Sequence, residues 1–201
     1  MSRVRFASQG VSAAERLRRG ARILRKGGVL AYPTEGVYGL GCDPFNFAAV
    51  QRIWDIKGRA ADKGLIIIGA TLAHFEPLLT SSALRSLANA EATRAQQPAS
   101  QRSTTWVVHA RSDVPMWLSG GRSSLAVRLT RHGRARALCC AFRGALVSTS
   151  ANISGARAAH SAQQARRWLP RAPDWILGGQ VGGELRPSRI VELESGRVLR
   201  D

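Results

Sequence analysis

The amino-acid sequence predicts an α/β protein, an open mixed sheet with helices packed on it. Short all-apolar runs that suit buried strands alternate with longer segments of helical periodicity. A hairpin pattern near the carboxyl end coexists with these segments, which indicates both parallel and antiparallel pairs. The 201 residues suffice for one well-packed domain and are too few for two full-sized ones, so we expect a single domain over 1–201 with its core at about 8–193.

The first predicted helix covers about residues 12–26. Ser12 and Glu15 have the spacing of a capping box, apolar residues follow at helical spacing, and two glycines end the segment. The run Val29–Tyr32 then predicts a buried strand. The glycine-containing stretch 33–41 predicts a loop at the carboxyl end of that strand, where open α/β sheets gather ligands.

The remaining segments follow the same two patterns. Apolar residues at helical spacing predict helices, and short apolar runs between glycines or polar residues predict strands. The predicted helices are 47–54, 71–95, 132–142 and 160–169, the predicted strands are 65–68, 105–109, 125–129 and 145–148, the polar segment 96–103 is expected to be an exposed loop, and 189–199 predicts a closing hairpin around Glu194-Ser195-Gly196.

The net charge of +17, with a pI of about 11.6, indicates a strongly basic surface. Such a surface is typical of proteins that bind nucleic acid or polyphosphate ligands. Much of the arginine lies in helical segments, for example at Arg16, Arg19 and Arg22, where a compositional preference for arginine explains it equally well. The charge alone therefore does not decide between these explanations.

The sequence lacks several features that would assign a compartment or a metal centre. No apolar run approaches the roughly 20 residues of a membrane span, and residues 1–6 are charged without a signal-peptide core, so the cytoplasm is expected. Cys42, Cys139 and Cys140 form no C-x-x-C spacing, which favours reduced thiols. The adjacent pair is better explained as buried structural cysteines than as a redox switch.

The stretch from Tyr32 to Lys63 predicts an anion-handling site. The chain has three lysines, and Lys57 and Lys63 both fall here, close to Arg59. An ammonium on a flexible stem can follow a phosphate through a reaction, whereas a guanidinium fork holds an oxyanion in a fixed geometry. Thr34 follows a proline at a strand end, which suits a hydroxyl facing ligand, although a simple Pro-Thr turn gives the same pattern.

Two later segments carry further polar groups at strand ends. Hydroxyls and an amide fill Ser148–Gly155 directly after an apolar run, where they suit phosphate or carboxylate oxygens or, alternatively, helix capping. Ser124 opens another strand, and Arg128 lies on it. A buried unpaired guanidinium is costly, so Arg128 requires an anionic partner. Neither a Walker loop nor a strand-linked G-x-G-x-x-G is present.

In their order along the chain, these segments resemble the YrdC/TsaC family, the threonylcarbamoyl-AMP synthases of tRNA modification, in its short single-domain type. Five blocks in one order are far more specific than any single block. The resembling blocks are 32–43, 57–65, 124–128, 148–155 and 187–190.

The resemblance implies a fold, a reaction and a pathway. The fold is a twisted, YrdC-like α/β sheet with a concave basic face. The reaction joins L-threonine, bicarbonate or CO2, and ATP into L-threonylcarbamoyladenylate, with release of diphosphate. Downstream enzymes then transfer the threonylcarbamoyl group to the adenosine beside the anticodon in tRNAs that read codons beginning with A.

The resemblance also implies roles for particular residues. Mg²⁺ is expected to arrive with ATP, since it commonly binds substrate phosphates, and no protein metal site is expected. The substrate carbamate would be the nucleophile, so no protein nucleophile is needed. The implied catalytic residues are Lys57 and Arg59, the ATP contacts are Lys57, Arg59, Lys63, Ser124, Ser148 and Asn152, and the threonine contacts are Thr34, Arg128, Ser150 and Ser188, with Arg128 pairing the carboxylate.

The segment 97–105 departs from the family pattern, and no site residue is assigned there. The main alternative is a non-catalytic module that binds tRNA or double-stranded RNA through phosphates. RNA readers usually stack bases on aromatic side chains, and aromatics here are only 6% of the chain. The related carbamoyl-transfer domain of hydrogenase maturation proteins is disfavoured, because those proteins are much longer and carry zinc-finger cysteines.

Overall fold

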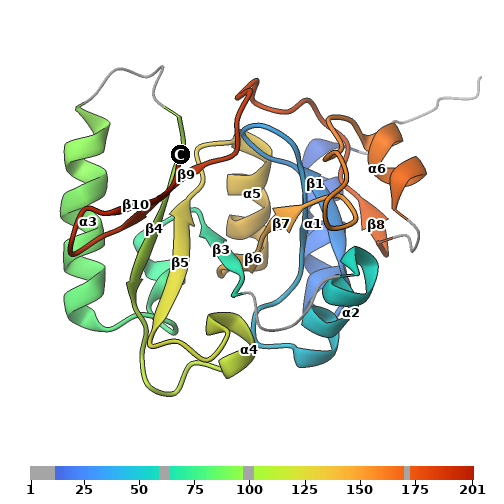
Figure 1. Ribbon diagram of the computed structural model, residues 1–201. Helices are drawn as coiled ribbons and strands as arrows, with labels where there is room; N and C mark the ends of the chain where they lie inside the picture. Colours follow the sequence, from blue (N-terminus) through green and yellow to red (C-terminus); the bar gives the residue numbers. More distant parts are fainter. Residues whose placement is uncertain (1–11, 59–63, 97–101, 170–172) are drawn as a thin grey trace, which may run out of the picture.

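The computed structural model describes residues 12–58, 64–96, 102–169 and 173–201 (Figure 1). The helices are α1 (Ala13–Arg25), α2 (Phe47–Lys57), α3 (Ser81–Ala95), α4 (Met116–Ser119), α5 (Gly133–Phe142) and α6 (Ala162–Trp168), with a 3-10 turn η1 (Leu72–Phe75). The strands are β1 (Leu30–Pro33), β2 (Tyr38–Gly41), β3 (Ile66–Gly69), β4 (Thr104–His109), β5 (Ser124–Leu129), β6 (Leu146–Val147), β7 (Thr149–Ser150), β8 (Trp175–Ile176), β9 (Arg189–Glu192) and β10 (Val198–Arg200).

The strands form two open mixed sheets rather than the single sheet that the sequence predicted. The larger sheet has the order β10-β9-β4-β5-β3-β6 and the smaller has the order β7-β2-β1-β8. Strand β3 runs parallel to β5, and β4 runs antiparallel to it. Helix α5 packs on both β1 and β3, so it connects the two sheets (Figure 1). The α/β class and the mixed strand directions are confirmed.

Helix α1 begins as its sequence predicted. The Ser12 hydroxyl accepts a hydrogen bond from the Glu15 backbone N–H at 3.1 Å, and the Glu15 carboxylate accepts one from the Ser12 backbone N–H at 2.9 Å. These bonds satisfy two of the donors that a helix start leaves unpaired. Gly27 has a φ of +79° just beyond the helix, a left-handed conformation that glycine adopts without steric cost.

Residues 38–41 form the buried strand β2, so the predicted loop over 33–41 is wrong there. Gly39 and Gly41 alternate with Tyr38 and Leu40, and glycines at this spacing predict a loop from the sequence alone. They are needed instead for close packing. A Cβ on Gly39 would lie 3.3 Å from the Ser148 hydroxyl, and one on Gly41 would overlap the backbone that leads into β7.

Other differences from the predicted elements involve short segments. The predicted helix over 71–95 divides into η1 and α3, and α4, β7 and β8 are too short to give a periodic signal. At the end of the segment 96–103, which was expected to be exposed, Ser103 is only 4% exposed. The hairpin of β9 and β10 is confirmed around Gly196.

Apolar side chains fill both sides of β3. Ile67 belongs to the larger buried cluster, which α2 and α3 cover, whereas Ile68 belongs to a smaller cluster beneath α1 and α5.

Of the cysteine pair, Cys139 lies in the smaller cluster, where burial raises the pKa of its thiol. Cys140 is exposed, so the prediction of a buried pair is wrong for that residue. Within the described ranges, no helix is long and apolar enough to cross a bilayer.

We predict that Gly41→Ala destabilises the protein. The added methyl group would lie 2.7 Å from the Tyr32 ring and would push β2 away from β6, at a cost of about 1–3 kcal/mol in the free energy of unfolding. Gly133→Ala is the matched control, because its Cβ meets nothing within 4 Å. Urea denaturation of both variants measures this difference, and equal stabilities would contradict the close-packing explanation.

Candidate active site

A polar cavity of about 500 Å³ lies between the two sheets. The smaller sheet and its adjoining loops contribute one wall, and the larger sheet contributes the other. Residues 182–187, here called the crossing segment, run toward β9 and contribute further lining. The lining includes Thr34, Glu35, Gly39, Ser148, Ser150 and Asn152 on the first side, Gly64, Ile66, Ser103, Ala126, Arg128, Ser188 and Arg200 on the second, and Glu184, Arg186 and Pro187 from the crossing segment.

The alternation of β5 determines which of its side chains face the cavity. Leu125 and Val127 point into the larger apolar cluster, whereas Ser124, Ala126 and Arg128 share the other face. Ser124 lies four residues from Arg128, or about 13 Å along the strand. It does not line the cavity and is therefore not brought together with the other predicted site residues.

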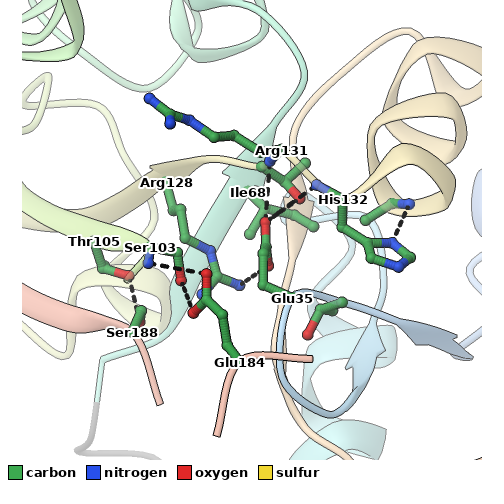
Figure 2. Close-up of polar contacts among 12 residues, drawn as sticks. Glu35, Ile68, Ser103, Thr105, Arg128, Arg131, His132, Glu184 and Ser188 are labelled. Atoms are coloured by element: carbon green, nitrogen blue, oxygen red, sulfur yellow. Dashed lines mark hydrogen bonds and ion pairs between the residues drawn. The ribbon is translucent and has the colours of Figure 1, made fainter. Parts of the chain in front are cut away.

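Arg128 and Glu35 form a buried ion pair across the site (Figure 2). The Arg128 Nη2 lies 3.5 Å from the Glu35 Oε2, and their side chains are only 11% and 9% exposed. Among the described residues, neither this carboxylate oxygen nor the Arg128 Nε has a hydrogen-bond partner. The prediction that Arg128 needs an anionic partner is confirmed, and the partner within the protein is Glu35.

The second carboxylate oxygen of Glu35 is fully engaged. Its Oε1 accepts hydrogen bonds from the Thr130 hydroxyl at 2.7 Å and from the backbone N–H groups of Arg131 at 3.0 Å and His132 at 3.4 Å (Figure 2). Burial raises the pKa of Glu35, but the Arg128 charge and the hydrogen bonds from Thr130 and Arg131 together outweigh it and lower the pKa. Glu35 is therefore held as a carboxylate.

Hydroxyls and a second guanidinium surround Ser188. The hydroxyls of Ser188 and Thr105 lie 2.8 Å apart, and Arg200 Nη2 donates to the Ser188 carbonyl oxygen at 2.7 Å and to its hydroxyl at 3.2 Å. Burial and the neighbouring charges of Arg128 and Arg102 lower the pKa of Arg200. This concentration of positive charge favours an anionic ligand at this end of the cavity.

Glu184 adds a carboxylate to the cavity wall. Its Oε1 accepts the backbone N–H of Ser103 at 3.0 Å, and its Oε2 accepts the Ser103 hydroxyl at 2.8 Å (Figure 2). The backbone N–H of Glu184 donates to the Glu35 carbonyl at 3.0 Å, and that of Gly182 donates to the Thr34 carbonyl at 3.0 Å. These bonds fasten the crossing segment to the turn after β1.

Thr34 lines the cavity, as its position after a strand predicted. Its hydroxyl donates to the Val37 carbonyl at 2.7 Å within the same turn, so its oxygen is left to accept a bond from a ligand. Ser148 is 4% exposed and also lines the cavity. The structure thus brings Thr34, Ser148, Ser150, Asn152, Arg128 and Ser188 to one cavity.

Lys57 lies at the end of α2 beneath the turn that follows β7. Its Nζ donates to the Ser150 carbonyl at 2.5 Å, the Asn152 carbonyl at 3.0 Å and the Asn152 Oδ1 at 3.0 Å. Lys57 is 3% exposed and is not among the residues that line the cavity. The side chain therefore holds Asn152 and Ser150 in position from behind.

Two predicted phosphate contacts, Arg59 and Lys63, lie outside the described residues. Gly64, the next residue after Lys63, lines the cavity near Arg122. In the ranges that the structure describes, no group of three or more His, Cys, Asp or Glu side chains is arranged to hold a metal ion.

Sequence reasoning did not assign several polar residues in or beside this cavity. Glu35 stands next to Thr34 in the stretch that predicts an anion-handling site, so its position in the sequence indicated that it could belong to the site. Ser103 and Thr105 lie in the segment that departs from the family pattern, and Glu184 and Arg200 are far away in the chain. Only the fold brings these residues to one place.

Solved structures share this fold. P. abyssi Sua5 complexed with L-threonine has a TM-score of 0.78 and 29% identity over 92% of this chain and 52% of that chain. E. coli YciO has a TM-score of 0.72 and 24% identity over 94% of this chain and 89% of that chain. The class of protein is therefore that of the Sua5- and YciO-like α/β folds.

Sequence comparisons agree with this class. The family model Sua5/YciO/YrdC, described as telomere recombination, matches residues 22–201. Threonylcarbamoyl-AMP synthases of Methylococcus capsulatus and Halorhodospira halophila are each 46% identical over 185 residues, which cover 92% of this chain and 96% and 94% of the relatives. The chain belongs to the Sua5/YciO/YrdC family.

We predict that Glu35→Gln changes the acid stability of the protein. A carboxyl whose folded pKa is lowered contributes stability above its unfolded pKa of about 4.3 and loses it as the pH falls through the folded pKa. Glu35→Gln should therefore cost about 3 kcal/mol at pH 7, with a difference from wild type that shrinks below about pH 4.

Urea denaturation across this pH range measures that difference. Asp113→Asn is the control, because Asp113 pairs with Arg111 on the surface. A difference between Glu35→Gln and wild type that stayed constant with pH would contradict the assignment of a stabilising carboxylate.

Proposed function

We propose that this chain is an L-threonylcarbamoyladenylate synthase, which joins L-threonine, bicarbonate or CO2, and ATP. The observation that carries this function is the buried Arg128 at one end of a hydroxyl-lined cavity, in a family where curated relatives are named threonylcarbamoyl-AMP synthase. A free amino acid has a carboxylate that suits this guanidinium, and the Sua5 structure is a complex with L-threonine.

In the proposed reaction, an oxygen of threonine carbamate attacks the α-phosphorus of ATP. A new P–O bond forms, the bond between the α-phosphorus and the bridging oxygen breaks, and diphosphate leaves with that electron pair. No protein nucleophile takes part. The protein's task is to hold two anions in line and to stabilise the charge that develops, which favours fixed cations and hydrogen-bond donors.

The cavity divides into two halves under this proposal. Thr34, Ser150 and Ser188 hold threonine around Arg128, which pairs with its carboxylate. Ser148 and Asn152 contact the nucleotide on the other side. Lys57 supports this side from behind by positioning Asn152. The remaining proposed nucleotide contacts are Arg59 and Lys63, and Ser124, which lies on β5 outside the cavity lining, would reach only a part of the nucleotide that extends beyond the cavity.

Mg²⁺ is proposed to enter with ATP, bound to its phosphates. The cavity carboxylates fit this arrangement, because Glu35 already accepts three hydrogen bonds and faces Arg128, while both oxygens of Glu184 bond Ser103. Phosphate oxygens and water would supply most ligands of the ion. The metal would neutralise charge on the phosphates and the leaving diphosphate.

The product is proposed to serve tRNA modification in the cytoplasm. A mixed anhydride of a carbamate and AMP is an activated acyl donor, so a second enzyme must consume it by transferring the threonylcarbamoyl group. The acceptor is proposed to be the adenosine beside the anticodon in tRNAs reading codons that begin with A. The support is the name shared by the curated relatives.

RNA binding is the second candidate function. The favouring observation is the outer face of α1, where Arg16, Arg18, Arg19, Arg22 and Arg25 are exposed and Glu15 is the one acidic residue of the helix. Such a face suits the phosphate backbone without reading its sequence, so the binding would weaken steeply with salt.

Diphosphate release from ATP tests the proposed synthase. We expect release only when threonine and bicarbonate are both present, because the carbamate is the attacking group. Omitting either substrate should reduce the rate to background, and serine in place of threonine is a useful comparison. Diphosphate release that is independent of threonine or bicarbonate would overturn the proposal.

Lys57→Met distinguishes the two candidate functions. The substitution keeps the length of the side chain but removes the ammonium that holds Ser150 and Asn152, so adenylate formation should fall by about 100-fold or more. The affinity for tRNA, measured by fluorescence anisotropy at several salt concentrations, should change by less than about 3-fold, since one charge contributes little to such binding. Full adenylate formation by the variant would contradict the role of Lys57.

A further inference from the structure

The position of Glu35 beside Arg128 points to a role that no predicted site residue fills. Glu35 belongs to the turn after β1, on the smaller sheet, whereas Arg128 lies on β5 of the larger sheet. The pair therefore bridges the two walls of the cavity. Both side chains are nearly buried, so little water reaches the Arg128 guanidinium. Its charge is therefore balanced by the Glu35 carboxylate rather than by solvent.

The orientation of the Glu35 carboxylate is fixed by the hydrogen bonds to Oε1. Three donors, the Thr130 hydroxyl and the N–H groups of Arg131 and His132, come from the three residues between β5 and α5. The segment directly after β5, the strand that carries Arg128, thus supplies the donors that orient Glu35. Oε2 is left pointing toward the Arg128 Nη2.

The contact between the two charges leaves hydrogen-bond capacity unused. At 3.5 Å the pair is an ion pair rather than a bidentate hydrogen bond, and in the described structure the Arg128 Nε also has no hydrogen-bond partner. A guanidinium has five N–H donors, so Glu35 balances the charge of Arg128 without occupying its donors. The Nε is itself buried, so a ligand oxyanion in the cavity would use the Nη donors of Arg128.

We propose that Glu35 is a positioning residue that holds the Arg128 guanidinium in the orientation that binds the substrate carboxylate. This role rests on the proposed function, because threonine supplies that carboxylate. Glu35 itself touches no reacting atom. Its removal should weaken threonine binding and leave the ATP side and the chemical step nearly unchanged.

Steady-state kinetics of Glu35→Gln test this role. We expect KM for threonine to rise about 10- to 100-fold, the loss typical of a hydrogen bond or ion pair to a charged group, with kcat and KM for ATP within about 3-fold of wild type. Glu35→Asp, which keeps the charge, should restore part of the affinity. An equal rise in both KM values, or an unchanged KM for threonine, would overturn the role.

Glu91→Gln is the matched control for a merely structural effect. Glu91 is also nearly buried, at 12% side-chain exposure, and pairs with Arg94 at 3.3 Å outside the cavity. Its substitution should leave KM for threonine within about 2-fold of wild type. A rise equal to that of Glu35→Gln would mean that loss of any buried carboxylate explains the effect.

Thr130→Val covers the case in which Glu35→Gln does not fold. Valine keeps the shape and removes only the hydroxyl that fixes Oε1, so KM for threonine should rise about 3- to 10-fold, again with little change in kcat. An unchanged KM in Thr130→Val, combined with an unfolded Glu35→Gln, would overturn the role.

Calorimetric titration of threonine separates this role from the proposed reaction. If wild type binds threonine and forms no adenylate, the reaction is wrong, and weaker binding by Glu35→Gln still supports the role of Glu35. If wild type forms adenylate and Glu35→Gln binds threonine as tightly, the role alone is wrong. If wild type binds no threonine, both are wrong.

Discussion

The buried ion pair between Glu35 and Arg128 is the interaction on which the site depends. It joins the smaller sheet, which carries Glu35 after β1, to the larger sheet, which carries Arg128 on β5. Residues 130–132, just before α5, hold the Glu35 carboxylate at this junction. A buried guanidinium without a partner would be strongly unfavourable, so an empty cavity that contains Arg128 requires Glu35 or an equivalent anion. The proposed binding group for the substrate, Arg128, is therefore also part of the connection between the sheets.

The polar residues of the proposed nucleotide side depend on a second constraint, the close packing of β2. Because Gly39 and Gly41 have no side chains, the backbone from Val147 to Ser150 lies directly against β2. Lys57 then holds the following turn from behind through its bonds to Ser150 and Asn152. The two glycines of β2 and the buried Lys57 thus hold hydroxyl and amide groups at the cavity in a fixed arrangement.

The sequence predicted the class of fold and most helices, because apolar periodicity is a local signal. The six predicted site residues that share the cavity came from polar groups near strands together with the family resemblance, which alone pointed to Ser188. It did not predict the division into two sheets, since pairing of β1 with β8 and of β2 with β7 involves very short strands far apart in the chain. The glycines of β2 suggested a loop because their packing partners are distant in sequence. The cavity residues Ser103, Glu184 and Arg200 meet only through tertiary contacts, which no local pattern encodes.

Mass spectrometry of the reaction with isotope-labelled bicarbonate tests the central claim most directly. Purified protein with ATP, Mg²⁺, L-threonine and ¹³C-bicarbonate should form threonylcarbamoyl-AMP that carries the label, because the carbamate carbon enters the product intact. Arg128→Met should form little of it at the same threonine concentration, since the carboxylate loses its charged partner. Unlabelled product, AMP alone, or full activity of Arg128→Met would contradict a two-substrate site organised around this ion pair.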